Sequence, residues 1–139
     1  MKKKQQRKIW CNKELITMPF YYCVVVSQKQ FDEQLKHLKV DYFDYMDDSK
    51  ATQGVLHVFE NANGNWSCVV AINENVLKDD VKAIGILVHE GVHMWQKYKE
   101  FIGEKNPSLE FEAYGIQKIF SNLMQSFAHQ KERHMRKLK

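Results

Sequence analysis

The chain has 139 residues, of which 44% are hydrophobic and 27% charged, and these values are typical of a single globular domain. No apolar run approaches the roughly 20 residues that a helix needs to cross a bilayer, and the basic start leads into too mixed a sequence for a signal peptide. Three widely spaced cysteines, Cys11, Cys23 and Cys68, favour reduced thiols over a disulfide framework. We therefore expect a cytoplasmic (intracellular) protein without a membrane partner.

The net charge of +4 is concentrated at the two ends of the chain. Residues 1–10 carry five Lys or Arg and no acid, residues 131–139 carry five Lys or Arg and one Glu, and the stretch between them has a net charge of −5. We interpret both basic ends as flexible tails of one domain that covers residues 1–139. Basic tails without a basic core or a DNA-binding motif do not favour a nucleic-acid partner.

The first third of the chain predicts a strand, a helix and a loop. Residues 20–27 are rich in aromatic and β-branched side chains, which is typical of a buried strand. Ser27 is a good cap for a helix from Gln28 to about Lys39, where apolar residues recur at helical spacing. The acidic and aromatic stretch 41–52 then predicts a loop.

The middle of the chain predicts a β-hairpin. Two strand-like runs, 54–60 and 66–73, are joined by the Asn/Gly-rich stretch 61–65, and this combination indicates antiparallel pairing through a tight turn. In the first run the apolar side chains alternate between two faces, so one face can pack on helices.

Two long helices are predicted to follow. The first covers residues 78–99, with Asp79 and Asp80 near its start, where carboxylates favour the positive end of the helix dipole. Ser108 caps the second, which extends from Leu109 to about His129 or beyond. The fold class expected from this order is α+β, with a small antiparallel sheet packed on about three main helices.

An HExxH motif, His89-Glu90-Gly91-Val92-His93, lies inside the first of these helices. Side chains four positions apart point the same way, so two imidazoles can reach one tetrahedral Zn²⁺ at ~2.0–2.1 Å. Glu90 approaches such an ion from the side, where a carboxylate can take a proton from water as general base. The alternative is a pair of ordinary core histidines satisfied by hydrogen bonds.

A catalytic zinc usually has a third protein ligand, and the next helix contains Glu110-Phe-Glu-Ala-Tyr114. HExxH followed by E-x-x-A on a second helix resembles the gluzincin metallopeptidases, the group that includes thermolysin. The run HEGVHMWQ … EFEAYGIQ is similar to small metallopeptidases of phages and prophages, and the resemblance covers about residues 54–125. It implies a zincin-like fold with an HExxH active-site helix and a C-terminal ligand helix.

Carried over by position, the resemblance implies that His89, His93 and Glu110 bind zinc and that Glu90 is the catalytic base. Measured against the apolar face of the last helix, however, Glu112 lies somewhat nearer the centre of that face than Glu110. The family pattern thus favours Glu110 as third ligand, the helical wheel mildly favours Glu112, and both stay open.

Further roles follow from the same resemblance with less support from the residues. Ala113 is the small residue that lets the two helices approach. Tyr114 stands where relatives often carry an Asp or Asn bonded to a ligand histidine, and a phenol orients an imidazole less well than a carboxylate does. For stabilising the oxyanion, His57, Tyr98 and Tyr114 are the candidates.

We therefore expect a zinc-dependent metallopeptidase that hydrolyses peptide bonds in a peptide or protein substrate, with Zn²⁺ as cofactor. The alternative is a zinc-containing binding or regulatory module on a peptidase scaffold, proteolytically inactive or highly restricted, because so short a chain has little material for a walled cleft. An extended substrate is expected to pair with an edge of the hairpin, and the strand just before the long helix is the better candidate.

Overall fold

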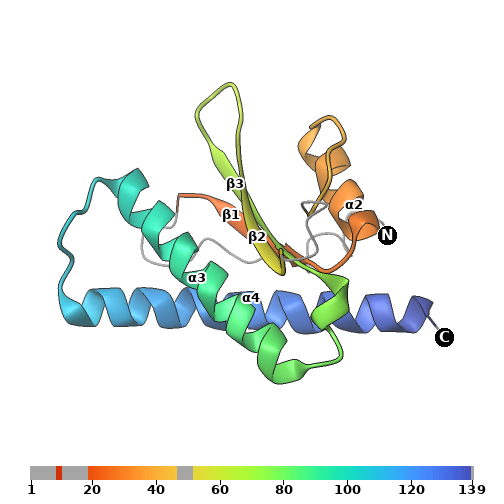
Figure 1. The fold of residues 1–139 in the computed structure, drawn as a ribbon. Coiled ribbons are helices and arrows are strands. Elements are labelled where there is room, and N and C mark those ends of the chain that lie inside the picture. Colours follow the sequence, from red (N-terminus) through yellow and green to blue (C-terminus); the bar gives the residue numbers. More distant parts are fainter. Residues whose placement is uncertain (1–8, 11–18, 47–51, 139) are drawn as a thin grey trace.

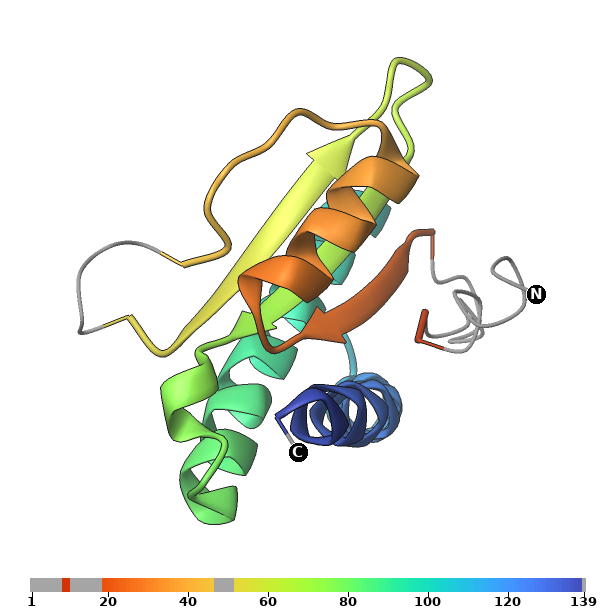
Figure 2. The same ribbon diagram turned by 90° about the vertical axis from the view of Figure 1, so that its right-hand side faces the viewer.

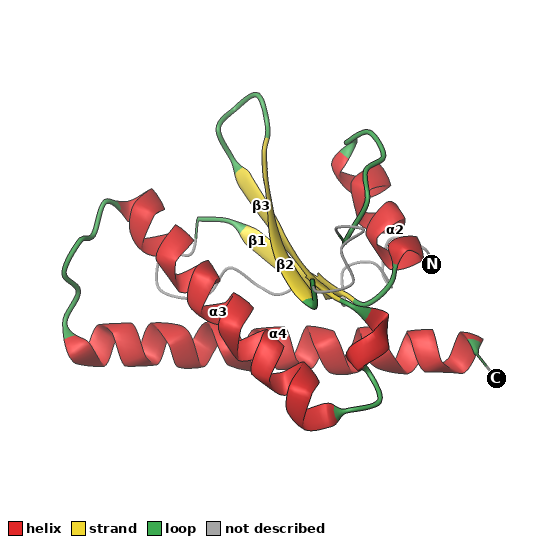
Figure 3. Ribbon diagram, viewed as in Figure 1, coloured by secondary structure: helices red, strands yellow, loops and turns green. Residues whose placement is uncertain are grey.

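The computed structural model describes residues 9–10, 19–46 and 52–138, and its elements follow the predicted order (Figures 1 and 3). They are β1 (Tyr21–Val25), α2 (Gln28–Leu38), β2 (Gly54–Glu60), β3 (Trp66–Ile72), the short 3₁₀ helix η1 (Glu74–Val76), α3 (Asp80–Ile102) and α4 (Leu109–Lys137). The α+β class is confirmed, and among the elements in these described ranges only η1 has no counterpart in the sequence prediction. Parts of the predicted N-terminal tail and of the 41–52 loop lie outside the described residues.

Helices α2 and α4 begin at the serine caps that the sequence predicted, whereas Asp79, expected inside the first turn of its helix, is the cap of α3. The side chains of Ser27, Asp79 and Ser108 each accept a hydrogen bond from a backbone N–H in the first turn of α2, α3 and α4, respectively. Helix α3 ends at Gly103, whose φ of 72° lies in the left-handed region that glycine adopts without strain.

The sheet is mixed, with strand order β1–β3–β2. Strands β2 and β3 form the predicted antiparallel hairpin, with Gly54 opposite Ile72. Strand β1, however, is parallel to β3, with Tyr21 opposite Ser67. The prediction of an entirely antiparallel sheet is therefore wrong. Strand β1 pairs with β3, the second strand of the hairpin, and nothing in the local sequence of β1 specifies this partner or its direction.

Helices cover both faces of the sheet (Figure 2). Alternate residues of the strands face α2 on one side and the pair α3 and α4 on the other, which gives two apolar cores. The core on the α3/α4 side is the larger, and it contains Tyr22, Val70, Leu87, Trp95 and Leu123 among its members. This packing holds α3 against the sheet along the turns that carry the HExxH motif.

Helices α3 and α4 approach each other closely where Trp95 meets Gly115. Trp95 is only 2% exposed. A Cβ atom added to Gly115 would lie 2.3 Å from Cζ3 of the Trp95 ring, so only glycine leaves room for the indole here. The contact fixes how α3 is rotated about its own axis.

Residues 131–137, which we interpreted from the sequence as part of a flexible tail, form the last turns of α4. They are held by ion pairs across the fold. The ammonium group of Lys131 lies 2.6 Å from a carboxylate oxygen of Asp80, and a guanidinium nitrogen of Arg133 lies 3.2 Å from Glu33. Part of the basic C-terminal charge is thus used to join α4 to α3 and α2. Within the described ranges, no helix is both long and apolar enough to cross a bilayer.

Two glycine-to-alanine substitutions test the α3–α4 contact. Gly115→Ala places a methyl group against the buried Trp95 ring and should lower the free energy of unfolding by about 1–3 kcal/mol. Gly85→Ala, within α3, is the matched control, because its Cβ would meet nothing within 4 Å and alanine favours helix by about 0.5–1 kcal/mol. Urea denaturation should therefore give changes of opposite sign, and changes of the same sign would refute the close packing at Gly115.

Candidate metal centre

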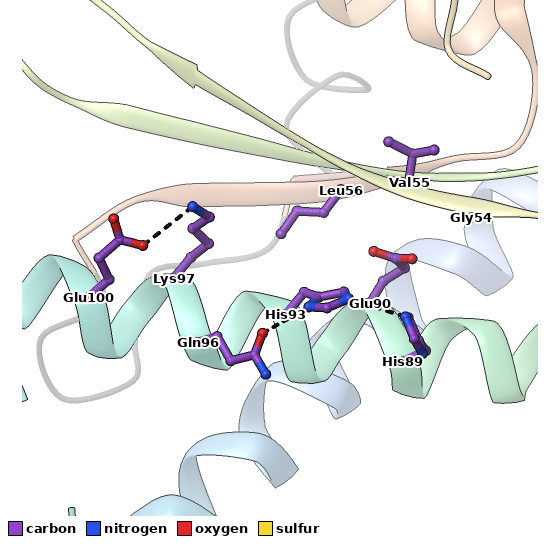
Figure 4. A pocket seen from close by; sticks show the side chains of 9 residues that line it. All are labelled: Gly54, Val55, Leu56, His89, Glu90, His93, Gln96, Lys97 and Glu100. Atoms are coloured by element: carbon purple, nitrogen blue, oxygen red, sulfur yellow. Dashed lines mark hydrogen bonds and ion pairs between the residues drawn. The ribbon is translucent and has the colours of Figure 1, made fainter. Parts of the chain in front are cut away.

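The two histidines of the motif meet on the exposed face of α3 (Figure 4). The Nε2 atoms of His89 and His93 are 3.1 Å apart, and their ring centroids are separated by 4.8 Å. The spacing of four residues produces this arrangement directly, because both side chains rise from the same face, one turn apart.

The two nitrogen atoms are suitable donors for a zinc ion. A tetrahedral ion bound at ~2.0–2.1 Å holds two nitrogen ligands about 3.4 Å apart, close to the separation of these two atoms. Without an ion, the same distance suits one hydrogen bond, in which one ring donates its Nε2–H to the bare Nε2 of the other. The residues present therefore fit two positions of a zinc coordination sphere.

Gln96 holds the other nitrogen of His93. Its Oε1 lies 2.8 Å from Nδ1 of His93, one turn further along the same face of α3 (Figure 4). The sequence analysis did not assign Gln96 a role, although the spacing of three residues on a helix was a signal that could have found it.

Glu90 is the buried member of the motif. It is 5% exposed, and its carboxylate points toward the start of β2 (Figure 4). A Cβ atom added to Gly54 would lie 3.3 Å from Oε1 of Glu90 and 2.4 Å from a methyl group of Ile86, so the backbone of β2 passes directly over the carboxylate. Burial raises the pKa of Glu90 above its ordinary value of 4.5, and the nearby His93 and His89 partly offset that rise.

A depression of about 520 Å³ opens over this group between α3 and β2. Its lining includes both histidines, Glu90, Gln96 and the first residues of β2. A second depression of about 380 Å³ lies toward the start of α3 and shares Gly54, His89 and Glu90 with the first. His89 and Glu90 of the motif therefore lie where the two depressions meet.

The predicted third ligand does not join the histidines. Glu110 is exposed in the first turn of α4, and Glu112 accepts a hydrogen bond of 3.0 Å from the indole Nε1–H of Trp95. Trp95 is two residues beyond His93, or roughly 200° around the helix, so Glu112 lies near the opposite side of α3. Across the residues that the structure describes, no three His, Cys, Asp or Glu side chains form a group that could hold a metal ion.

The candidates for supporting roles also lie apart from the histidines. Tyr114 is 64% exposed on α4, and Tyr98 is buried and stacks on Trp95 with ring centroids 5.4 Å apart. Nε2 of His57 lies 2.9 Å from the backbone oxygen of Tyr45, and its ring stacks on Phe31 of α2. His57 therefore points to the face of the sheet opposite α3, and none of these three side chains lines either depression.

The strand edge beside the motif belongs to β2. Strand β3, which the sequence analysis preferred for pairing with a substrate, is flanked by β1 and β2 and has no open edge. That prediction is wrong, because the hairpin inserts its second strand into the centre of the sheet. The first residues of β2, Gly54 to Leu56, line the larger depression instead.

The buried Glu90 predicts a particular dependence of stability on pH. Because the pKa of Glu90 is raised above 4.5 in the folded protein, its contribution to stability is full below about pH 4.5 and is lost as the pH rises through the folded pKa. Glu90→Gln removes this loss. With a chelator present, the variant should gain stability relative to the native chain as the pH rises from about 4.5 to neutral, measured by urea denaturation at several pH values. A difference that stays constant over this range would contradict the assigned burial of the carboxylate.

Comparison with known proteins gives no match for this chain, whether to a family model, to a curated protein or to a solved structure.

Proposed function

We propose that this chain is a zinc-dependent metallopeptidase in which His89 and His93 bind the metal and Glu90 is the general base. The observation that carries the proposal is the pair of Nε2 atoms 3.1 Å apart, with a buried carboxylate beside them in a depression that reaches a strand edge. The resemblance of HExxH and E-x-x-A to the gluzincins supports the same chemistry.

Each group of the motif has a separate task in this proposal. A bound zinc ion would supply the Lewis acidity that activates water and polarises a peptide carbonyl. Glu90 accepts a proton from the attacking water at its carboxylate and delivers it to the leaving amine nitrogen. Its raised pKa suits the first of these steps, because a carboxylate with a higher pKa is the stronger base.

The substrate in this proposal is an extended peptide laid along the start of β2. Strand β2 pairs with β3 on one side only, and no described strand covers its other side. An extended chain can add to such an edge through main-chain hydrogen bonds, which position a carbonyl without requiring particular side chains.

The third protein ligand in the proposal is Glu110, as the resemblance implies. In the described geometry Glu110 does not contact the histidines. Glu112, by contrast, accepts a hydrogen bond from Trp95, and its carboxylate lies 3.9 Å from the ammonium group of Lys99. Glu112 therefore has a structural role of its own, and the choice of Glu110 rests on the resemblance alone.

The alternative is a zinc-binding module without peptidase activity. It is favoured by one observation, the absence of a third ligand near the two histidines within the described part of the chain. A two-histidine site on an open surface could be completed by a side chain of a bound protein, and the chain would then act as a metal-bridged binding module.

Substitution of Glu90 separates the two functions. Glu90→Gln keeps both imidazoles and should retain zinc while losing most of the peptide hydrolysis, because an amide cannot accept the proton. Zinc content is measured by elemental analysis and hydrolysis with a peptide library, on the same samples. Glu100→Gln is the matched control, because Glu100 lines the same depression on the same helix, and it should keep both properties.

Hydrolysis that survives in Glu90→Gln at the native rate would exclude Glu90 as the base. One zinc per native chain with no cleavage of any library peptide would favour the binding module, and no zinc uptake by the native chain would exclude both.

The two candidate third ligands predict different losses. Glu110→Gln should weaken zinc binding and leave the free energy of unfolding nearly unchanged, because Glu110 is exposed. Glu112→Gln should keep zinc binding and change stability, since it replaces a charged acceptor of the Trp95 N–H with a neutral one, an effect of about 1 kcal/mol. Zinc titration and urea denaturation of both variants check this assignment, and a loss of zinc binding confined to Glu112→Gln would reverse it.

A further inference from the structure

Gln96 makes one hydrogen bond with its side chain, and that bond is to a histidine of the motif. Its Oε1 lies 2.8 Å from Nδ1 of His93, and no other partner is given for this side chain within the described residues. Both residues are exposed on α3, so the contact is not a by-product of burial. Its geometry comes from the spacing of three residues on one helix.

The contact favours one of the two neutral tautomers of His93. A neutral imidazole has one N–H, and an amide oxygen can only accept a hydrogen bond. The contact with Oε1 of Gln96 is a hydrogen bond only when Nδ1 carries the proton, and in that tautomer the lone pair of Nε2 is free. Nε2 of His93 lies 3.1 Å from Nε2 of His89. Two nitrogen atoms at this distance can share one proton or bind one cation.

The other tautomer of His93, with its proton on Nε2, would block that nitrogen as a metal ligand. If Nδ1 of His93 had no acceptor, the proton could lie on Nε2, where it would occupy the position that the metal needs. Ligand histidines in metal sites accordingly donate their second N–H to a carboxylate, a backbone carbonyl or water, which fixes both the tautomer and the ring orientation.

We infer that Gln96 is a positioning residue that holds His93 in the Nδ1–H tautomer and so prepares its Nε2 for a cation. The inference concerns the metal site of the proposed function, but the tautomer itself is a property of the metal-free chain. Gln96 takes the part that the family resemblance would give to Tyr114, which is 64% exposed on α4. Because the amide is neutral, it orients the ring without adding a charge near the buried Glu90.

The first test reads the tautomer without any metal. Long-range ¹H–¹⁵N correlation spectra of the imidazole rings, recorded with a chelator present and at a pH where the rings are neutral, should show the Nδ1–H form of His93 in the native chain. Gln96→Leu removes the acceptor at similar size and should shift His93 toward a mixture of tautomers. Gln96→Glu keeps an acceptor at the same position and should restore the Nδ1–H form.

The second test measures the affinity for zinc by competition with a chromogenic chelator. Loss of a supporting partner of this kind typically weakens metal binding about 10–100-fold, so Gln96→Leu should show a loss in this range and Gln96→Glu should bind at least as tightly as the native chain. Gln117→Leu is the matched control, because Gln117 is an exposed glutamine on α4, and it should change neither measurement.

The outcomes separate this inference from the proposed function. Unchanged His93 spectra in Gln96→Leu would overturn the inference, even if the chain binds zinc and cleaves peptides. A native chain that takes up no zinc would overturn the proposed function, whereas spectra that change as expected would still support the role of Gln96 in setting the tautomer.

Discussion

The packing of Trp95 against Gly115 is the constraint on which the arrangement of this molecule depends. It fixes the rotation of α3, because the indole can be buried only where α4 offers no side chain. Once Trp95 faces α4, the helical period directs Glu90 to the sheet and turns both histidines to the open surface beside β2. The same rotation explains why the glutamates of α4 lie away from the imidazoles. One apolar contact thus determines which groups share the candidate site.

The fold was predictable from the sequence where the signals are local. Caps such as Ser27 and Ser108, the hairpin turn and the helical periodicity gave the class and nearly all of the elements. The parallel pairing of β1 with β3 was not predictable, since an all-apolar strand has the same hydrophobic pattern whichever strand it pairs with. The extension of α4 through Lys137 was missed for a related reason, because its basic residues are paired with acids that are distant in sequence.

The candidate site likewise has features that follow from local sequence and features that depend on the packing of distant elements. The convergence of His89 and His93 follows from their spacing on one helix, and so does the contact of Gln96 with His93, although it was overlooked. The position of Glu110 depends on how two helices cross, which no spacing within one helix can express. Gly54 could not be assigned from the sequence either, because its closeness to Glu90 arises only when β2 lies over α3.

The long-range pairing of β1 has a consequence for how the chain reaches its native state. Tyr21 pairs with Ser67, so this strand leaves the ribosome well before its partner exists. Until β3 exists, the valine and aromatic side chains that β1 buries in the folded protein are exposed to solvent. Closing the long chain segment between β1 and β3 also costs entropy before the two strands pair. The N-terminal strand can therefore join the sheet only after β3 has been synthesised.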